Sequence, residues 1–245
     1  MKNLLSLIFI LSLYISFAQK KEIKKAEKLF ESGDVKGASE ILNKNKSMFE
    51  TADEKVNLQK TYLEAKIDQA NGDFKSSYGK YQEYLKGGGK DPEYKNKILK
   101  LTSDIVNSAI EDNAEKRYPT AASKLYLAYT INPETNMDYL YYAASSAVNG
   151  SDFKVALDYY NSLKEIKYEG IVTKYFAKSV ESGEEVELSE SEYNIYKKTK
   201  DYSDFKEETS ESKYPEIIRN IALIYAQLGD NENAMKAVKL ARESD

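Results

Sequence analysis

Five pairs of small residues recur along this chain of 245 residues with the same internal spacing. The second member of each pair lies twelve positions after the first, and a short turn-forming segment lies between them. The first members are Ala26, Ala65, Ala109, Ala144 and Ala222, and the second members are Ala38, Ser77, Ala121, Ala156 and Ala234. Two antiparallel helices approach closely only where both carry a small side chain at their crossing. The pattern therefore predicts five helical hairpins.

The turn inside each predicted hairpin has a recurring chemistry. It reads Gly33-Asp34, Gly72-Asp73 and Gly229-Asp230 in three units, and Ser151-Asp152 and Lys116-Arg117 in the other two. Glycine ends a helix well because it adopts the left-handed backbone conformation, and aspartate begins the next helix by accepting a backbone hydrogen bond. Apolar residues then follow at helical spacing, so each unit is predicted to be helix, turn, helix.

An insertion is predicted at 170–212, because the last two pairs of small residues lie much further apart than the others. Residues 172–180 are rich in β-branched and aromatic side chains. Residues 181–184 are typical of a turn, and Val186 and Leu188 follow it. This order predicts a small β-hairpin before the last repeat.

The rest of the insertion is predicted to be a short helix and a loop. Ser189 and Glu192 have the spacing of a capping box, which begins a helix. An acidic, serine-rich loop is expected from there to Ser212. A new helix then begins with Pro215 in its first turn.

The unit nearest the C-terminus resembles the tetratricopeptide repeat (TPR) family, in the order apolar, small, aromatic, turn, alanine. The residues that carry the resemblance are Ile221, Ala222, Tyr225, Gly229, Asp230, Ala234, Val238 and Ala241. The unit around Ala144 and Ala156 is similar, with Pro133 where the family often ends a second helix. The resemblance implies an all-α, TPR-like helical-hairpin solenoid of about five units, with the β-hairpin insertion before the last one.

The N-terminus is typical of a cleavable signal peptide. Lys2 supplies a positive charge, residues 4–17 are apolar apart from serines, and Ser16 and Ala18 are small residues where a signal peptidase requires them. We expect cleavage after Ala18 and a periplasmic or secreted protein. A retained anchor is the alternative, although a span needs about 20 apolar residues and charge resumes within a few positions. The insertion at 170–212 is similar to insertions in some exported TPR proteins of Gram-negative bacteria.

These expectations divide the chain into four parts. Residues 1–18 form the signal peptide, 19–169 hold TPR-like repeats 1–4, 170–212 form the insertion, and 213–245 form the last repeat.

Composition excludes several functional classes. The chain has no Cys and no His, so disulfides, thiolate metal sites and imidazole catalysis are excluded. The net charge is −4, with acids and bases interspersed, which disfavours nucleic acid as a partner. The acidic runs at 181–187 and 207–211 lack the residue pattern of a calcium loop, and the glycines at 87–89 lack that of a phosphate loop. We expect no catalytic residue, no cofactor and no metal site.

The resemblance implies that the first helices of the repeats line a groove for a protein or peptide partner. Eight residues lie one turn either side of the small residues on these helices: Tyr62, Lys66, Gln69, Tyr141, Ser145, Asn149, Arg219 and Gln227. Tyr and Arg are frequent at binding hot spots, but with 21 tyrosines in the chain the same positions also suit packing between helices. The paired Lys and Asn with which some family members hold a C-terminal carboxylate are absent.

The function predicted from the sequence is an exported scaffold that mediates protein–protein interaction in the cell envelope, without catalysis and with membrane contact only through its partners. One alternative is an accessory factor for outer-membrane assembly or secretion machinery. Another, from a different class, is a glycan hydrolase that uses carboxylates.

The last predicted helix, 231–244, suggests self-association. Ala234, Val238 and Ala241 are expected to pack on the preceding helix, which leaves Met235, Ala237 and Leu240 near the open end of the solenoid. Several apolar side chains there favour either pairing of two chains or a longer repeat array that continues beyond Asp245, since burying one Leu or Met stabilises an interface by roughly 1.5 to 3 kcal/mol.

Overall fold

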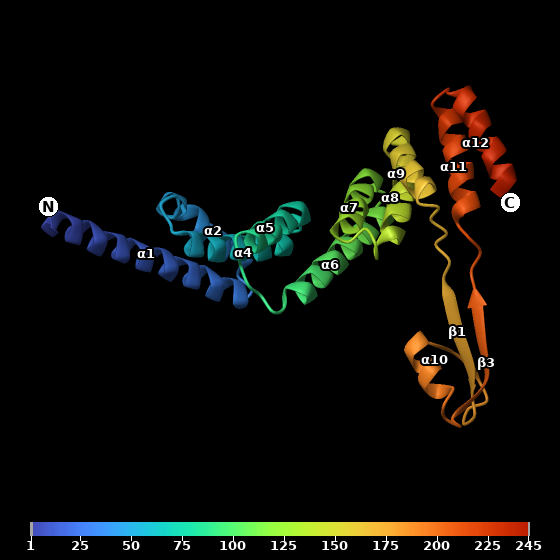
Figure 1. The fold of residues 1–245 in the computed structure, drawn as a ribbon, viewed down its shortest axis with the longest axis horizontal. Helices are drawn as coiled ribbons and strands as arrows, with labels where there is room; N and C mark the ends of the chain where they lie inside the picture. The colour runs from blue at the N-terminus through green and yellow to red at the C-terminus, as the bar shows by residue number, and fades with distance from the viewer. Residues whose placement is uncertain (1, 245) are drawn as a thin grey trace. The chain divides into compact units, whose positions relative to one another are not determined.

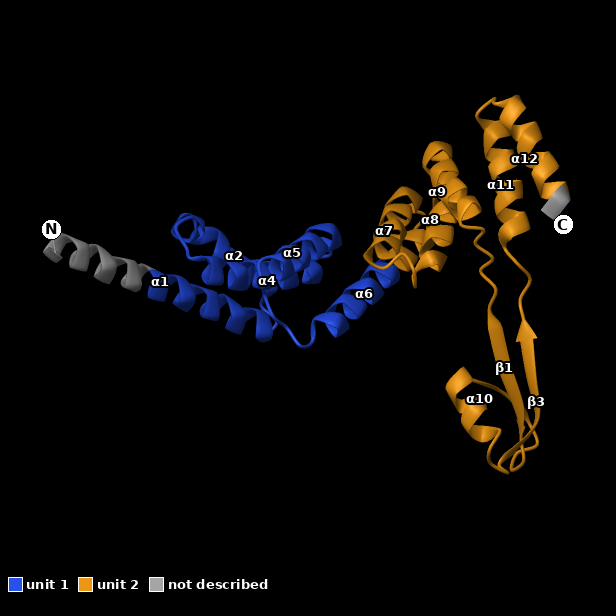
Figure 2. Ribbon diagram, viewed as in Figure 1, with its two compact units in different colours: residues 1–108 blue, residues 109–245 orange. Residues whose placement is uncertain are grey.

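A computed structural model describes the backbone of residues 2–244 and the side chains of residues 16–242 (Figure 1). It consists of helices and one three-stranded sheet, so the predicted fold class is confirmed. The chain divides into two compact units, residues 1–108 and 109–245 (Figure 2). Most of the predicted signal peptide lies outside the described side chains, and its cleavage stays a prediction, as does the four-part domain division.

Unit 1 contains two helical hairpins and the start of a long helix. Its elements are α1 (Lys2–Glu31), α2 (Val35–Lys44), α3 (Lys46–Phe49), α4 (Glu54–Ala70), α5 (Phe74–Lys86) and α6 (Tyr94–Ala114), the last of which continues into unit 2. Ala26 and Ala38 are fully buried between α1 and α2. Ala65 and Ser77 are equally buried between α4 and α5, where the Ser77 hydroxyl donates to the Ala65 carbonyl at 2.8 Å. The serine is tolerated because its polar atom has this partner.

Unit 2 also contains helical hairpins with small residues where the helices cross. Its helical elements are α7 (Tyr118–Ile131), α8 (Met137–Asn149), α9 (Phe153–Glu165), α10 (Glu190–Tyr196), α11 (Tyr214–Gln227) and α12 (Asn231–Ser244). Ala144, Ala156 and Ala222 belong to one buried cluster together with Leu163 and Ile221. The small residues predicted to mark helix crossings therefore lie in the core.

The five predicted turns share one backbone geometry. The residue with positive φ is Gly33, Gly72 or Gly229 in three turns, and Lys116 (φ +62°) or Ser151 (φ +58°) in the other two. In every turn the next residue donates its backbone N–H to the carbonyl five positions earlier, at 2.7 to 2.9 Å. This is the hydrogen bond that closes a Schellman helix end, so the predicted helix, turn, helix units are confirmed.

Aspartates begin the second helices, as the sequence predicts. The Asp34 side chain accepts from the Gly37 N–H at 2.8 Å, and Asp230 accepts from the Asn233 N–H at 3.1 Å. Arg117, which replaces the aspartate in the third unit, makes no side-chain cap. Its guanidinium binds a buried carboxylate of the preceding helix instead.

The backbone at Gly72 allows a test of the turn geometry. Gly72 has φ +79°, so Gly72→Ala should destabilise unit 1 by roughly 1 to 2 kcal/mol. Gly79 lies exposed within α5, and a Cβ there meets nothing within 4 Å, so Gly79→Ala should stabilise by roughly 0.5 to 1 kcal/mol. Urea unfolding of the two variants measures both changes. Shifts of the same sign would contradict the assigned turn.

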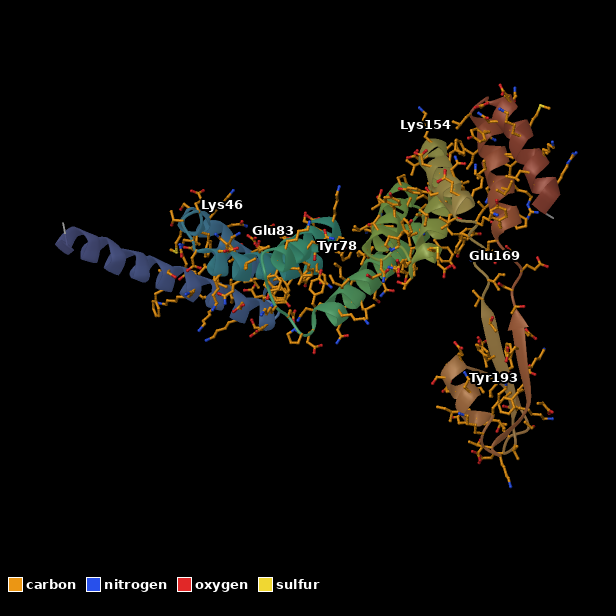
Figure 3. The ribbon with its side chains drawn as sticks, viewed as in Figure 1. Lys46, Tyr78, Glu83, Lys154, Glu169 and Tyr193 are labelled. Atoms are coloured by element: carbon orange, nitrogen blue, oxygen red, sulfur yellow. The ribbon has the colours of Figure 1, made fainter. Side chains whose placement is uncertain are left out.

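The insertion contains a sheet of three strands, β1 (Thr173–Ser179), β2 (Glu185–Leu188) and β3 (Tyr202–Thr209). All pairing is antiparallel, in the order β2-β1-β3. Tyr193 of α10, labelled in Figure 3, packs against Tyr175 and Phe205 with ring centroids 4.8 and 5.3 Å away. The capping box of Ser189 and Glu192 is confirmed.

The prediction of an acidic loop up to Ser212 was wrong, because β3 occupies most of that segment. Most of the charged side chains of β3 are exposed, so its composition resembles that of a loop. Backbone pairing with β1 and the contact of Phe205 with Tyr193 are what make it a strand. Neither β1 nor Tyr193 is adjacent to β3 in the sequence.

The prediction of which side chains of α12 are buried was wrong at three positions. Ala237 is buried and Leu240 packs against the core of unit 2, whereas Val238 is 42% exposed. Only Met235, at 75% exposure, lies open as predicted. The buried stripe is Ala234, Ala237 and Ala241, a rotation of the helix that lets three alanines approach α11. Self-association through this helix stays a prediction, with Met235 and Val238 as its exposed apolar side chains.

Candidate partner-binding surface

The predicted groove residues of α4 have partners within unit 1. The Tyr62 hydroxyl donates to Asp91, and the Gln69 amide donates to Asp104 at 2.7 Å. The Lys66 ammonium lies 5.2 Å from the centroid of the Tyr62 ring. Burial, together with the hydrogen bond to Asp91, raises the pKa of the Tyr62 hydroxyl. Tyr62 and Gln69 therefore connect α4 to the loop before α6 and to the middle of α6.

Two predicted groove residues of α8, Tyr141 and Ser145, have hydrogen-bond partners within unit 2. The Tyr141 hydroxyl donates to the Glu216 carboxylate of α11 at 2.8 Å. The Ser145 and Tyr160 hydroxyls lie 3.2 Å apart, and Asn220 donates to Tyr160 at 3.1 Å. These contacts hold α8, α9 and α11 together.

The three remaining predicted residues are exposed. Asn149 ends α8, Arg219 lies on the surface of α11, and Gln227 ends α11. Two exposed apolar side chains that the sequence analysis missed lie on the same helices, Tyr142 at 46% and Leu223 at 64% exposure. Partner binding by the eight predicted residues stays a prediction.

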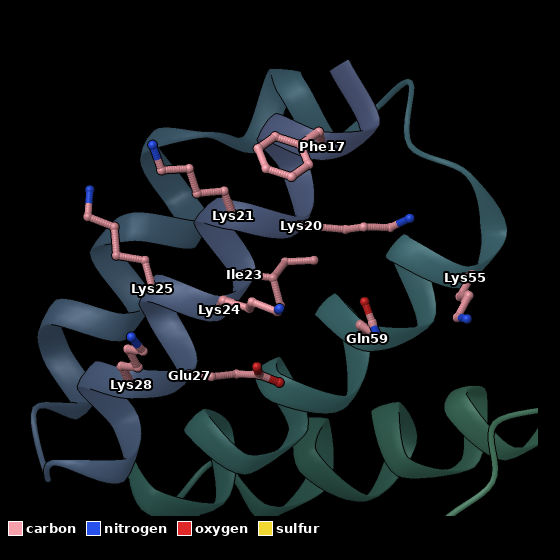
Figure 4. Close-up of a pocket in the computed structure, with 10 residues that line it drawn as sticks. All are labelled: Phe17, Lys20, Lys21, Ile23, Lys24, Lys25, Glu27, Lys28, Lys55 and Gln59. Carbon is pink, nitrogen blue, oxygen red and sulfur yellow. The ribbon is translucent and has the colours of Figure 1, made fainter. Parts of the chain in front are cut away.

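A hollow of about 760 Å³ lies beside α1 and α4 in unit 1 (Figure 4). We call it the lysine groove, and it is lined by Phe17, Lys20, Lys21, Ile23, Lys24, Lys25, Glu27, Lys28, Lys55 and Gln59. Six of these residues are lysines and one is a glutamate. The surface of the groove therefore carries a formal charge of +5.

The sequence spacing of three groove residues places them on the same side of α1. Lys20, Lys24 and Glu27 are four and three positions apart, so they share one side of α1. Figure 4 shows them on the side of α1 that faces Lys55 and Gln59 of α4. Three ammonium groups and one carboxylate are thus gathered at the opening.

The base of the groove is apolar. Ile23 is only 2% exposed and belongs to the core that α1, α2 and α4 share, while Phe17 is 72% exposed at one end. Lysine stems add methylene groups to this surface. Lys20, Lys24 and Lys55 make no ion pair with the described residues. The groove can therefore accept a ligand that combines apolar groups with carboxylates.

The sequence analysis missed this groove because it projected binding positions from the small residues of α4, α8 and α11. The available signal was the density of lysines at 20–28, where five of nine residues are lysine. Their companion Lys55 lies on another helix, so only the fold brings it to the same opening.

The buried carboxylates have structural partners. Burial alone would raise the pKa of Asp112, but hydrogen bonds from Lys124 and Arg117 outweigh it and hold the pKa below its ordinary value. Hydrogen bonds from Lys97 and Tyr62 lower the pKa of Asp91 in the same way. A general acid needs a raised pKa, so neither carboxyl is suited to the general-acid role in glycan hydrolysis. Within the described side chains, no group of three or more acidic residues is arranged to hold a metal ion.

No family model and no curated protein matches this chain. Solved structures do match. One is a putative kinesin light chain with nearly identical TPR-like repeats from Podosopora anserina, at 13% identity and a TM-score of 0.36, covering 91% of this chain and 93% of that one. Pseudomonas aeruginosa pilF has 12% identity, a TM-score of 0.33 and coverage of 94% and 78%. NprR in complex with its cognate peptide NprX has 14% identity, a TM-score of 0.29 and coverage of 94% and 67%.

Because these TM-scores are low, the repeat assignment rests on the turns and crossings of the chain itself. Five turns with one backbone geometry and small residues buried at the helix crossings are sufficient for it.

Proposed function

We infer that this chain is an exported, non-catalytic scaffold of the cell envelope, and that it binds a protein partner in the lysine groove. The observation that carries the proposal is the cluster of six lysines around an apolar base on the first helices of two neighbouring repeats. Ammonium groups at an opening attract carboxylates, and an apolar base contributes affinity when a side chain covers it. A partner segment with acidic and apolar side chains satisfies both.

Export is supported by the N-terminal sequence. Cleavage after Ala18 makes Gln19 the first residue, and Gln19 is 1% exposed with its amide donating to the Met48 carbonyl at 2.7 Å. The processed chain would thus begin at a residue that the fold of unit 1 holds. It would lose Phe17 from the groove and gain an α-ammonium group next to Lys20. No described helix is long and apolar enough to cross a bilayer.

Affinity capture from the native envelope tests this function. The bait is compared with a groove variant, Lys20→Glu, Lys24→Glu and Lys55→Glu, and with a control variant, Lys75→Glu, Lys86→Glu and Lys90→Glu. The control changes the net charge equally at exposed lysines of α5 and the loop after it.

We expect partner proteins to bind the unchanged bait and the control, and to be reduced at least tenfold on the groove variant, since three attractive charges become repulsive. Added salt should weaken the capture. The intact mass of the envelope protein should begin at Gln19. Equal capture by all three baits would refute binding in the groove, and a mass that retains residues 1–18 would refute cleavage.

A further inference from the structure

The turn between β1 and β2 carries the chemistry opposite to that of the lysine groove. We call residues 180–185 the acidic tip, which contains Glu181, Glu184 and Glu185 beside Val180. All three glutamates are exposed, and Val180 is 61% exposed. The tip therefore offers one exposed apolar side chain and three exposed carboxylates. The Val180 N–H donates to the Asp201 carbonyl at 2.9 Å, so the exposed Lys198 and Lys200 belong to the segment beside it.

This turn lies at one end of the three-stranded sheet. The register pairs Thr173 with Thr209 at the end that leads to α9 and α11, so the acidic tip lies at the opposite end of the sheet. Gly183, at φ +71°, has nothing within 4 Å of an added Cβ, so open space lies beside this residue of the turn. Backbone bonds fix its shape, since the Ser179 N–H donates to the Glu184 carbonyl at 2.9 Å and the Gly183 N–H donates to the Ser179 carbonyl at 2.9 Å.

We propose that the lysine groove receives the acidic tip of a second copy of this chain. Three carboxylates of the tip meet the ammonium groups of Lys20, Lys24 and Lys55, and Val180 covers the apolar base formed by Ile23 and the lysine stems. The inference rests on the proposed function, because it names the partner of the same groove. The charges favour this occupant, since the groove carries +5 and none of the three lysines at its opening has an ion-pair partner among the described residues.

The contact joins two different surfaces, so it is a head-to-tail contact. A complex of two copies leaves one groove and one tip unused, and copies therefore add until the assembly closes into a ring or grows as a filament. Salt should weaken the contact because its polar part is exposed at the rim.

Sedimentation of the purified processed chain, residues 19–245, over a range of concentrations tests the proposal. One variant neutralises the groove, Lys20→Gln, Lys24→Gln and Lys55→Gln, and another neutralises the tip, Glu181→Gln, Glu184→Gln and Glu185→Gln. All six residues are exposed, so both variants should fold, which circular dichroism checks. We expect the unchanged chain to form assemblies of two or more copies, and each variant alone to lose at least tenfold in association constant.

Mixing the two variants gives the decisive result. The mixture contains one intact groove and one intact tip, so it should form a 1:1 complex that grows no further. A monomeric unchanged chain at high concentration, including one whose tip contacts its own groove, would overturn the proposal. Assembly that survives in both variants would also overturn it and point to another surface, such as Met235 and Val238 of α12.

Two further outcomes separate this inference from the proposed function. If the chain stays monomeric while the groove still captures other envelope proteins, the inference fails and the proposed function stands. If the chain binds anionic vesicles through the same lysines without self-association, the groove serves a membrane surface and both fail.

Discussion

Replacing Asp112 by alanine should lower the free energy of unfolding by about 2 to 3 kcal/mol. The Asp112 side chain is 4% exposed and binds two cations, Lys124 at 2.6 Å and Arg117 at 2.6 Å. Removing one partner of a buried ion pair typically costs 3 to 5 kcal/mol, and the partial exposure of Arg117 reduces that figure here. Urea unfolding monitored by circular dichroism measures the change.

Asp68→Ala is the matched control. Asp68 occupies the corresponding position of the α4/α5 hairpin and binds Lys80 at 2.7 Å, but its side chain is 19% exposed and it has one cation rather than two. The expected loss is about 1 kcal/mol, as for a partly solvated pair. Equal losses at the two positions would show that burial does not decide the strength of the pair.

The loss of unfolding free energy caused by Asp112→Ala should depend on pH. Its pKa is lowered in the folded chain, so its contribution is complete above the unfolded pKa of about 3.9 and is lost as the pH falls through the lower folded pKa. The difference between Asp112→Ala and the unchanged chain should therefore shrink below about pH 4. A difference that stays constant to lower pH would mean that packing, rather than charge, is responsible.

Enlarging the small residue at the α8/α9 crossing should be about as damaging. Ala144 and Ala156 are both fully buried in the core of unit 2. Ala144→Leu keeps helix propensity high but adds volume where the helices touch, and overpacking of this kind typically costs 1 to 3 kcal/mol. We expect a loss of about 3 kcal/mol, measured as a fall in the urea midpoint.

Ala226→Leu provides the control for that change. Ala226 lies exposed on α11, so the same substitution there should alter stability by less than about 0.5 kcal/mol. If Ala144→Leu were equally harmless, the spacing of twelve would not mark the points where helices cross.

The sequence by itself determined the repeating unit, because its determinants are local. Left-handed turn residues such as Gly72, capping aspartates such as Asp34 and small residues such as Ala144 act within one hairpin. Their effects depend on separations of a few to twelve positions, which a periodic pattern reveals. The β1/β2 hairpin and the capping box of α10 were predictable for the same reason.

The tertiary structure decided which groups meet across larger separations. Two predicted groove residues, Tyr62 and Tyr141, donate hydrogen bonds to Asp91 and Glu216, which lie 29 and 75 positions away in the sequence. Lys55 reaches the opening formed by the lysines of α1 only because α4 packs on that helix. Charge and polarity along the chain are the same whether a side chain meets a partner or solvent, so the packing of whole helices was needed to distinguish them.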